Sequence, residues 1–463
     1  MGESGEPGNV RAPDRPGAPA ARRRAVRDAH RLHAARALCR TNPLRREGPD
    51  APARGTGQPG VQAPRGRTVM RNAHSPLSVT FKIASRCNLN CSYCYVYNKL
   101  DDSWRRQPAM ISDEVIDASV AALRRHCAKS GQRLLRIVFH GGEPLLVGHE
   151  RFDCWCRKLR SLDDSVEVRL ALQTNGVLID DKWAELFAAH KIVVGISIDG
   201  TPDVHDAQRV DHKGRGSYSG VLRGVEALRR NAVGFSLLSV ISLGSDPVAT
   251  HRHLLSLGPA QIEYLFPDQT HDTIGALRAR HGPTPGADFL IPIFEQWWGS
   301  GDMKVRVGPF MAIVRAILGG VCEVDFIGNN PLGYLFVEPD GAIEGLDVLR
   351  TCGPGLARTG MNVRNHDFSD MEDHCKFHYQ VIFEGLSLPR GCRTCRERST
   401  CAGGYLPHRF ASDGGFDHPS AWCADILRLF DHLRSRLGVP PAETLLRREA
   451  LDSLSVDTEG VPA

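Results

Sequence analysis

Residues 87–94 read CNLNCSYC and follow closely on a short apolar run, VTFKIA at residues 79–84. Three cysteines with the spacing C-x3-C-x2-C on one loop can wrap one corner of an iron–sulfur cubane and ligate three of its four irons. The remaining iron is then open to a small molecule that has an amine and a carboxylate, and can pass it an electron. The alternative is a structural zinc site, which usually has four protein ligands. Cys127 could be the fourth ligand only if it faced this loop, which its helical setting does not favour.

From about residue 76 the chain alternates short runs rich in Val, Ile, Leu and Phe with longer amphipathic stretches, such as residues 113–126 and 218–230. This alternation predicts an α/β fold with parallel strands, either a barrel or a doubly wound sheet. Polar and glycine-rich motifs follow several of the runs, and the C-terminal ends of parallel strands in a barrel converge. We therefore expect the active site at those ends. The predicted strands are Val79–Ala84, Leu134–Phe139, Val168–Gln173, Ile192–Ile198, Phe235–Ile241 and Ile262–Phe266.

With HGGEP at residues 140–144 and an aromatic residue, Tyr93, before the last cysteine of the loop, the chain resembles the radical S-adenosylmethionine (SAM) superfamily. The resemblance implies a partial (β/α)6 TIM-like barrel and a 4Fe-4S cluster that binds SAM. It implies that Cys87, Cys91 and Cys94 hold this cluster. Glu143 would receive the SAM amino group and Arg209 would reach its carboxylate. By the same resemblance the SAM site comprises Tyr93, Gly141, Gly142, Glu143, Pro144, Thr174, Asn175, Ser197, Asp199 and Arg209.

A second group of cysteines has the spacing Cys392-x2-Cys395-x5-Cys401, and Cys423 follows. Four thiolates can ligate a closed 4Fe-4S cluster, which exchanges electrons but does not bind SAM. A zinc ribbon is the alternative. The spacing resembles the SPASM extension of radical SAM peptide-modifying enzymes, a Cys-rich α+β (SPASM/twitch-type) region, and this implies one auxiliary 4Fe-4S cluster.

The chain departs from the full SPASM pattern at two places. Tyr405 and Leu346 stand where cysteines of a further auxiliary cluster are expected, so we expect that cluster to be absent, which leaves Cys322 and Cys352 without a ligand set. Asp347 follows the second of these positions. In sulfatase-maturing relatives an Asp there acts as a base, so Asp347 is the candidate catalytic base; the alternative is a strand-end Asp that accepts bonds from nearby backbone N–H groups.

Residues 401–410, CAGGYLPHRF, and 419–423, PSAWC, resemble one SPASM subgroup, the three-residue-cyclophane-forming (Fxs-type) maturases of ribosomal peptides. This implies a precursor peptide as substrate, a carbon–carbon crosslink to an aromatic residue as product, and an external electron donor of the flavodoxin or ferredoxin type. Other SPASM oxidases remain as alternatives: sulfatase-maturing enzymes, which form formylglycine, and thioether-forming maturases. A zinc-stabilised nucleic-acid-binding protein is a remote alternative.

Residues 1–70 form a basic tail rich in Gly, Pro, Ala and Arg, with 14 Lys and Arg against 6 Asp and Glu, in a chain whose net charge is +5. We expect this segment to be disordered, with Met70 as an alternative initiator. The remainder is slightly acidic, which argues against nucleic-acid binding. The sequence shows neither an apolar run that could span a membrane nor a secretory signal. We therefore expect a cytoplasmic protein whose 14 cysteines are ligands or free thiols.

The expected organisation has four parts: the tail at residues 1–70, the barrel at 71–300, the SPASM-like region at 301–435 and a C-terminal tail at 436–463. A β-hairpin is predicted within the third part, with strands at Leu335–Val337 and Ala342–Glu344 joined through Pro-Asp-Gly. A helix is predicted over Ala424–Leu437.

Overall fold

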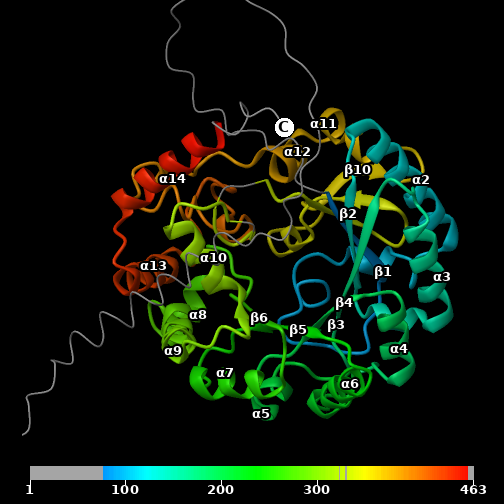
Figure 1. Cartoon of the computed structure of the whole chain (residues 1–463), viewed down its shortest axis with the longest axis horizontal. Coiled ribbons are helices and arrows are strands. Elements are labelled where there is room, and N and C mark those ends of the chain that lie inside the picture. Colours follow the sequence, from blue (N-terminus) through cyan, green and yellow to red (C-terminus); the bar gives the residue numbers. More distant parts are fainter. Residues whose placement is uncertain (1–76, 323, 329–330, 457–463) are drawn as a thin grey trace, which may run out of the picture. The chain divides into compact units, whose positions relative to one another are not determined.

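The computed structural model describes residues 77–322, 324–328 and 331–456, with side chains up to residue 449 (Figure 1). All of these residues belong to one compact unit. The predicted disorder of residues 1–70 and the alternative start at Met70 lie outside the described residues. None of the helices in the described ranges is long and apolar enough to cross a bilayer.

The described strands form one ten-stranded sheet in the order β10-β9-β8-β1-β2-β3-β4-β5-β6-β7. Neighbouring strands from β1 to β7 run parallel, and the order does not close on itself, as predicted for a partial barrel. The six predicted strands are confirmed to within one or two residues at each end. The strands of this part are β1 (Ser78–Ala84), β2 (Leu134–Gly141), β3 (Glu167–Thr174), β4 (Val193–Ser197), β5 (Phe235–Val240), β6 (Gln261–Leu265) and β7 (Arg306–Val307).

Helices connect these strands and lie on the outer side of the sheet, as α3, α4, α6 and α7 do in Figure 1. Both predicted helices form, and the first extends four residues beyond its expected end. The connecting elements are η1 (Ser103–Arg106), α2 (Asp113–Ser130), η2 (Pro144–Val147), α3 (His149–Arg160), α4 (Asp181–Ala189), α5 (Pro202–Asp206), α6 (Tyr218–Arg230), α7 (Pro247–Ser256), α8 (Ile274–His281), α9 (Pro285–Ser300) and α10 (Gly308–Ile317).

Local chemistry sets the ends of α2, and packing fixes the helices on the sheet. The Ser112 side chain accepts a hydrogen bond from a free N–H of the first turn of α2, and Gly131 ends this helix with φ of 71°. The ring of Phe152 on α3 lies 4.6 Å from Phe139 on β2 and 5.4 Å from Trp183 on α4. Truncating a buried aromatic of this kind to Ala costs about 3–5 kcal/mol.

The predicted hairpin also forms, with β8 (Tyr334–Val337) and β9 (Ala342–Glu344) antiparallel. The sequence did not predict that β8 joins the barrel sheet, where Leu335 pairs in register with Val79 of β1. The hairpin therefore continues the sheet past the first strand of the barrel. The expected boundary near residue 300 stays a prediction.

The remaining elements form the cysteine-rich part of the chain. The predicted helix near Ala424 is confirmed as α13, which packs against α9. The C-terminal tail predicted after residue 435 contains a further helix, α14, which the sequence did not reveal. These elements are η3 (Asp347–Thr351), β10 (Arg358–Asn362), η4 (Phe368–Asp370), α11 (Met371–His374), α12 (Lys376–Tyr379), the π-helix η5 (Gln380–Glu384), η6 (Arg390–Cys392), η7 (Pro407–Arg409), α13 (Cys423–Leu437) and α14 (Pro441–Val456).

Candidate active site and auxiliary cluster site

Cys87, Cys91 and Cys94 lie on the loop that follows β1, and each is half-buried. Backbone hydrogen bonds tie this loop to the segment that follows α5. The N–H of Asn90 donates to the carbonyl of Val210 at 2.7 Å. The three thiols are therefore held at the C-terminal end of the sheet, as the sequence predicted.

The surroundings of the three thiols favour their protonated form. Burial, together with the carboxylate of Glu143, raises the pKa of Cys87 to about 12. Burial also raises the pKa values of Cys91 and Cys94, although Arg209 opposes this at both thiols. Thiols in this setting become thiolates when a metal centre stabilises them.

The donor set around this loop fits a cluster better than a single zinc ion. Within the described residues no group of three His, Cys, Asp or Glu side chains could hold one metal ion. Cys127 is buried in α2, where Asp163 and Arg133 are the charged groups that affect its pKa. Those residues precede β3 and β2, at the opposite end of the strands from the loop. Cys127 is therefore not a fourth ligand, and the three loop thiols match the three protein ligands of a cubane with one open iron.

The Gly-Gly-Glu motif packs directly against the cysteine loop. The N–H of Gly142 donates to the carbonyl of Ala84 at 2.8 Å, and the N–H of Glu143 donates to the carbonyl of Arg86 at 2.9 Å. A Cβ on Gly141 would lie 2.2 Å from the carbonyl oxygen of Ala84, and one on Gly142 would lie 2.3 Å from that of Arg86. Glycine is required at both positions because the two loops approach so closely.

Glu143 is fully buried and links the ends of β2 and β3. Its carboxylate accepts hydrogen bonds from the hydroxyl of Thr174 at 2.7 Å, from the N–H of Asn175 at 2.9 Å and from the N–H of Leu145 at 3.1 Å. Burial raises its pKa, and these bonds oppose that effect. A carboxylate can accept about four hydrogen bonds in total, so Glu143 can still accept one from an amino group. Its predicted role toward SAM remains compatible with this geometry.

Tyr93, Asp199 and Arg209 form a buried triad beside the loop. The Tyr93 hydroxyl donates to Asp199 Oδ2 at 2.5 Å and accepts a bond from Arg209 Nη1. The guanidinium of Arg209 also lies 3.9 Å from Asp199. Its Nε is buried and has no hydrogen-bond partner among the described residues. A buried, unsatisfied donor is costly, and a ligand carboxylate, such as that of SAM, would satisfy it.

The remaining predicted SAM-site residues are also brought to this end of the sheet. Asn175 donates to the side-chain oxygen of Asn88 in the cysteine loop at 2.7 Å. Ser197, at the end of β4, accepts a hydrogen bond from Gln173 on β3 at 2.9 Å. Pro144 begins η2 and is buried. The ends of β1, β2, β3 and β4 therefore converge on one site.

Asp347 lies in a buried network of charged side chains that crosses from the hairpin region to β1. Its Oδ2 is 2.9 Å from Lys82 Nζ and accepts a hydrogen bond from the Tyr95 hydroxyl at 2.7 Å. Burial alone would raise the pKa of Asp347, but Lys82 and Arg350 outweigh it and lower the pKa below its usual value. The carboxylate is therefore ionised at neutral pH.

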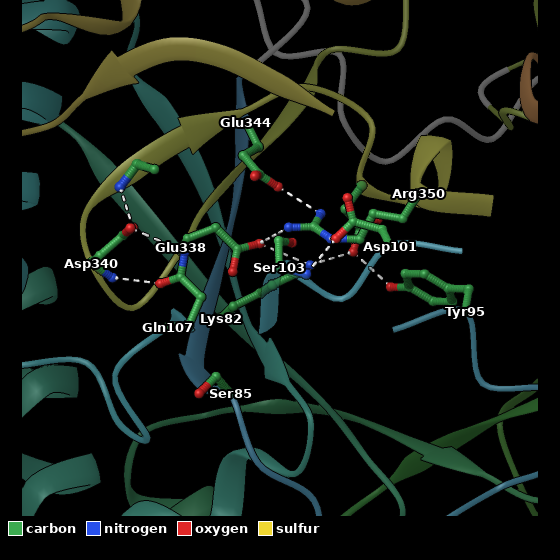
Figure 2. A network of polar contacts seen from close by, with 12 residues as sticks. Lys82, Ser85, Tyr95, Asp101, Ser103, Gln107, Glu338, Asp340, Glu344 and Arg350 are labelled. Atoms are coloured by element: carbon green, nitrogen blue, oxygen red, sulfur yellow. Dashed lines mark hydrogen bonds and ion pairs between the residues drawn. The ribbon is translucent and has the colours of Figure 1, made fainter. Parts of the chain in front are cut away.

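Several members of this network were not identified from the sequence. Lys82 Nζ is also 2.9 Å from Glu338, and Arg350 pairs with Glu338 at 3.1 Å and with Glu344 at 2.6 Å (Figure 2). The only sequence signal was a lysine inside the apolar run of β1. His140, which is in register with Lys82 on the next strand, has a buried Nδ1 without a partner among the described residues. Burial lowers the pKa of His140, so this imidazole is neutral.

The second set of cysteines is also brought together. Cys392, Cys395, Cys401 and Cys423 line one small cavity. Burial raises the pKa of Cys401 to about 12. The four thiols thus fit a closed cluster with four thiolate ligands, and they do not form a group that could hold a single metal ion.

Asp425 fixes the fourth cysteine of this set relative to the barrel. It is fully buried in the first turn of α13, two residues after Cys423, and accepts hydrogen bonds from the N–H groups of Gly286 at 2.7 Å and Ala287 at 3.1 Å. These are first-turn N–H groups of α9, which have no partner within their own helix.

The two residues that replace cysteines of a further auxiliary cluster, Leu346 and Tyr405, take part in apolar packing. Leu346 belongs to a buried cluster with Leu349, Val381 and Leu406, and Tyr405 packs against it. Cys352 lies in the same cluster and donates to the carbonyl of Pro407. Cys322 is buried as well and donates to the carbonyl of Ala312. Both thiols are part of the packed interior.

Comparison with known proteins agrees with this geometry. Residues 81–246 match the radical SAM superfamily. The serine-type anaerobic sulfatase-maturating enzyme of Klebsiella aerogenes is 30% identical over 355 residues, which are 72% of this chain and 80% of the relative. The cysteine-type anaerobic sulfatase-maturating enzyme of Clostridium perfringens (strain 13 / Type A) is 25% identical over 378 residues, 78% of this chain and 97% of the relative.

Solved structures give the same fold. Native anSMEcpe with bound AdoMet superimposes with a TM-score of 0.68 at 22% identity, covering 78% of this chain and 98% of that one. SuiB of Streptococcus suis bound to the precursor peptide SuiA gives a TM-score of 0.50 at 12% identity, covering 75% and 76%. The α/β fold with its parallel sheet is therefore that of radical SAM enzymes, which use SAM and 4Fe-4S clusters as cofactors. The chain is an enzyme that belongs to the radical SAM superfamily, in the SPASM-type group that includes the anaerobic sulfatase-maturating enzymes.

Proposed function

We propose that this enzyme is a peptide maturase that forms a carbon–carbon crosslink between an unactivated side-chain carbon and an aromatic ring of a ribosomal precursor peptide. The observation that carries a radical oxidation with loss of a proton is the ionised, buried carboxylate of Asp347, which Tyr95 links to the cysteine loop. The apolar packing of Leu346 and Tyr405 carries the choice of a crosslink over an aldehyde. Tyr95 directly follows Cys94. A base therefore lies beside the place where a substrate radical would form.

The SAM site is proposed from the residues at the ends of β1 to β4. Cys87, Cys91 and Cys94 would hold the cluster, and SAM bound there would supply a 5′-deoxyadenosyl radical that removes one hydrogen atom from the substrate. Arg209 would bind the SAM carboxylate through its unsatisfied Nε, and Glu143 would accept a bond from the amino group. Their burial holds both groups in place and keeps water from the radical.

Asp347 would complete the oxidation by accepting a proton. After a carbon radical adds to an aromatic ring, one proton and one electron must leave before aromaticity returns. Asp347 is ionised in the resting enzyme and can take the proton. The cluster proposed at Cys392, Cys395, Cys401 and Cys423 would take the electron.

Apolar side chains occupy the place of the second auxiliary cluster, and this supports a product other than that of the sulfatase-maturing relatives. Those relatives usually have both auxiliary clusters, whereas Leu346 and Tyr405 pack in an apolar cluster here. Crosslink formation needs one acceptor for the proton and one for the electron, and the proposed base and the single proposed auxiliary cluster would provide these. We also propose that an external donor of the flavodoxin or ferredoxin type delivers the first electron and that nucleic acid is not a partner.

A second candidate is oxidation of a serine or cysteine to an aldehyde, as in the sulfatase-maturating enzymes named above. The similarity of those relatives over 72–78% of the chain favours it. It would need the same radical and the same base.

The test is to incubate the reconstituted enzyme anaerobically with SAM, dithionite and two synthetic peptides. One carries the sequence of a short reading frame beside the gene with aromatic residues near its C-terminus, and the other is a serine-containing sulfatase peptide. Both products lose two hydrogens, but only an aldehyde reacts with a hydrazine probe. A crosslink leaves the peptide inert to hydrazine and blocks fragmentation between the joined residues. An adduct with hydrazine would overturn the crosslink proposal in favour of the second candidate.

A further inference from the structure

Arg409 is a buried cation without a carboxylate partner among the residues that the structure describes. Four arginines are buried in the described residues: Arg209, Arg350, Arg409 and Arg434. Three of them pair with a carboxylate, Arg209 with Asp199, Arg350 with two Glu residues and Arg434 with Glu397. Arg409 is 3% exposed, and no carboxylate of the described residues forms an ion pair with it. Because a buried charge is costly unless it is paired, its counter-charge must come from another source.

The loop after Cys401 is built around this guanidinium. Arg409 Nε donates to the carbonyl of Gly404 at 2.9 Å, and Nη2 donates to the carbonyls of Gly404 at 2.7 Å and Ala402 at 2.9 Å. A Cβ on Gly403 would lie 3.0 Å from the guanidinium carbon. The loop therefore closes directly over the charged group.

The backbone of this loop is strained to reach that arrangement. Ala402, Gly403 and Gly404 all have positive φ, of 52°, 91° and 73°. For Ala402 this left-handed conformation is unfavourable, because the side chain crowds the backbone. Such strain persists where the surroundings enforce it, and here it turns two carbonyl oxygens toward Arg409. These oxygens solvate the cation but do not neutralise it.

The acidic groups that act on Arg409 are thiols of the second cysteine set. Gly403, which packs against the guanidinium of Arg409, lines the same cavity as Cys401 and Cys392. Burial lowers the pKa of Arg409, and these two thiols oppose that effect. Both thiols line the cavity that the four cysteines share. A cubane held by four thiolates is an anion, and its negative charge grows by one when it takes up an electron. An adjacent fixed cation stabilises the reduced form more than the oxidised form.

We propose that Arg409 is the counterion of the auxiliary cluster at Cys392, Cys395, Cys401 and Cys423, and that its charge raises the reduction potential of this cluster. This inference rests on the proposed auxiliary cluster. It makes Arg409 a positioning residue for electron uptake, since it does not ligate iron or touch the substrate. An arginine suits the task because its charge is retained at every working pH.

The test measures the midpoint potential of the auxiliary cluster by anaerobic redox titration with EPR detection. The full-length chain with Cys87, Cys91 and Cys94 replaced by Ala serves as the parent, so that one cluster gives the signal. Arg409→Gln keeps hydrogen-bond donors but removes the charge. At the midpoint potential of the parent, the ratio of reduced to oxidised cluster in Arg409→Gln should be at least about tenfold lower than in the parent. This corresponds to a decrease of about 59 mV in the midpoint potential for a one-electron couple. Arg409→Lys keeps the charge, and its ratio should change less than about threefold.

Arg390→Gln is the matched control. Arg390 is near Cys392 in the chain, but its side chain is 79% exposed and paired with Asp417. Water and salt screen such a charge, so the ratio should change less than about twofold.

Each outcome separates this inference from the proposed function. A parent protein that holds zinc, or no iron, overturns the auxiliary cluster itself. An intact cluster whose potential is unchanged in Arg409→Gln overturns the counterion role and leaves the cluster standing. If Arg409→Gln does not assemble a cluster, Arg409→Lys decides: an assembled cluster with the potential of the parent supports the role of the charge, and a failure to assemble shows that Arg409 only holds the loop.

Discussion

Lys82 Nζ lies 2.9 Å from Asp347 Oδ2 and 2.9 Å from Glu338 Oε1, so one buried ammonium joins the first strand of the barrel to two carboxylates of the hairpin region. The side chain of Lys82 is 5% exposed. This contact connects residues that are more than 250 positions apart in the chain. It fixes the candidate base relative to the sheet that presents the SAM site.

Replacing this lysine should destabilise the fold strongly. Lys82→Met leaves Glu338 and Asp347 without their shared cation, and removing one partner of a buried ion pair typically costs about 3–5 kcal/mol. We expect a loss of that size in the free energy of unfolding, measured by urea denaturation at pH 7. Lys158→Met is the control, because Lys158 pairs with Asp117 at the surface and should lose less than about 1 kcal/mol. A comparable loss of unfolding free energy in both variants would mean that the buried ion pairs of Lys82 stabilise the fold no more than the surface pair of Lys158.

Glu344 should make stability depend on pH near neutrality. Burial and the neighbouring Glu338 raise the pKa of Glu344 to about 7, while Arg350 and Lys82, which face it, oppose this. Because the folded pKa exceeds the unfolded value of about 4.3, the folded state binds more protons between these values. Stability from this group is therefore lost as pH rises from about 4.3 to about 7, and is constant above.

Glu344→Gln should remove this component. The free energy of unfolding of the variant, relative to that of the parent, should increase by on the order of 1–3 kcal/mol between pH 4.5 and pH 7.5. Loss of the bond to Arg350 shifts the curve of the variant by the same amount at every pH and does not affect this difference. The measurement is urea unfolding at several pH values. Glu167→Gln should leave the slope above pH 5 unchanged, because Arg169 lowers the pKa of Glu167 and it is ionised throughout. Parallel pH curves for parent and Glu344→Gln would contradict the assignment.

Replacing Asp347 should separate SAM cleavage from product formation. Asp347→Asn removes the proton acceptor, and a general base contributes about 10²–10⁴-fold to rate. We expect 5′-deoxyadenosine to form at no less than about half the parental rate, while modified peptide falls at least about a hundredfold. Both are quantified by liquid chromatography and mass spectrometry. Asp340→Asn, in the hairpin turn where Asp340 bonds Gln107, is the control and should keep both rates. Parallel loss of both products in Asp347→Asn would exclude a late role for this residue.

Sequence patterns predicted the parts of the molecule that depend on local order. The six barrel strands follow from apolar runs, and the convergence of Cys87, Glu143 and Asp199 follows from their places after successive strands. The partners of Lys82 could not be predicted, because Glu338 and Asp347 are brought to it only when β8 pairs with β1. Such pairing depends on the register of distant strands, which no local pattern encodes.

The need for glycine at the two positions before Glu143 could not be explained from the sequence either. The sequence indicates a turn and, by resemblance, a SAM contact. The reason that no side chain fits is the approach of Ala84 and Arg86 from another loop. For Arg409 the sequence shows only one basic residue among many. Its burial without a carboxylate partner in the described part of the chain depends on how distant segments pack.

Loss of the loop thiols should abolish SAM cleavage without loss of the second iron site. With Cys87, Cys91 and Cys94 replaced by Ala, reductive formation of 5′-deoxyadenosine should fall below detection, since no open iron remains to bind SAM. Iron should fall from about eight to about four per chain, because the cavity lined by Cys392, Cys395, Cys401 and Cys423 is left intact. Cys127→Ala is the control: this buried thiol lies beside Asp163, at the other end of the barrel, so iron content and SAM cleavage should both persist. Continued SAM cleavage by the triple variant would show that the loop does not hold the reactive cluster, and an iron content near zero would show that the two sites do not assemble independently.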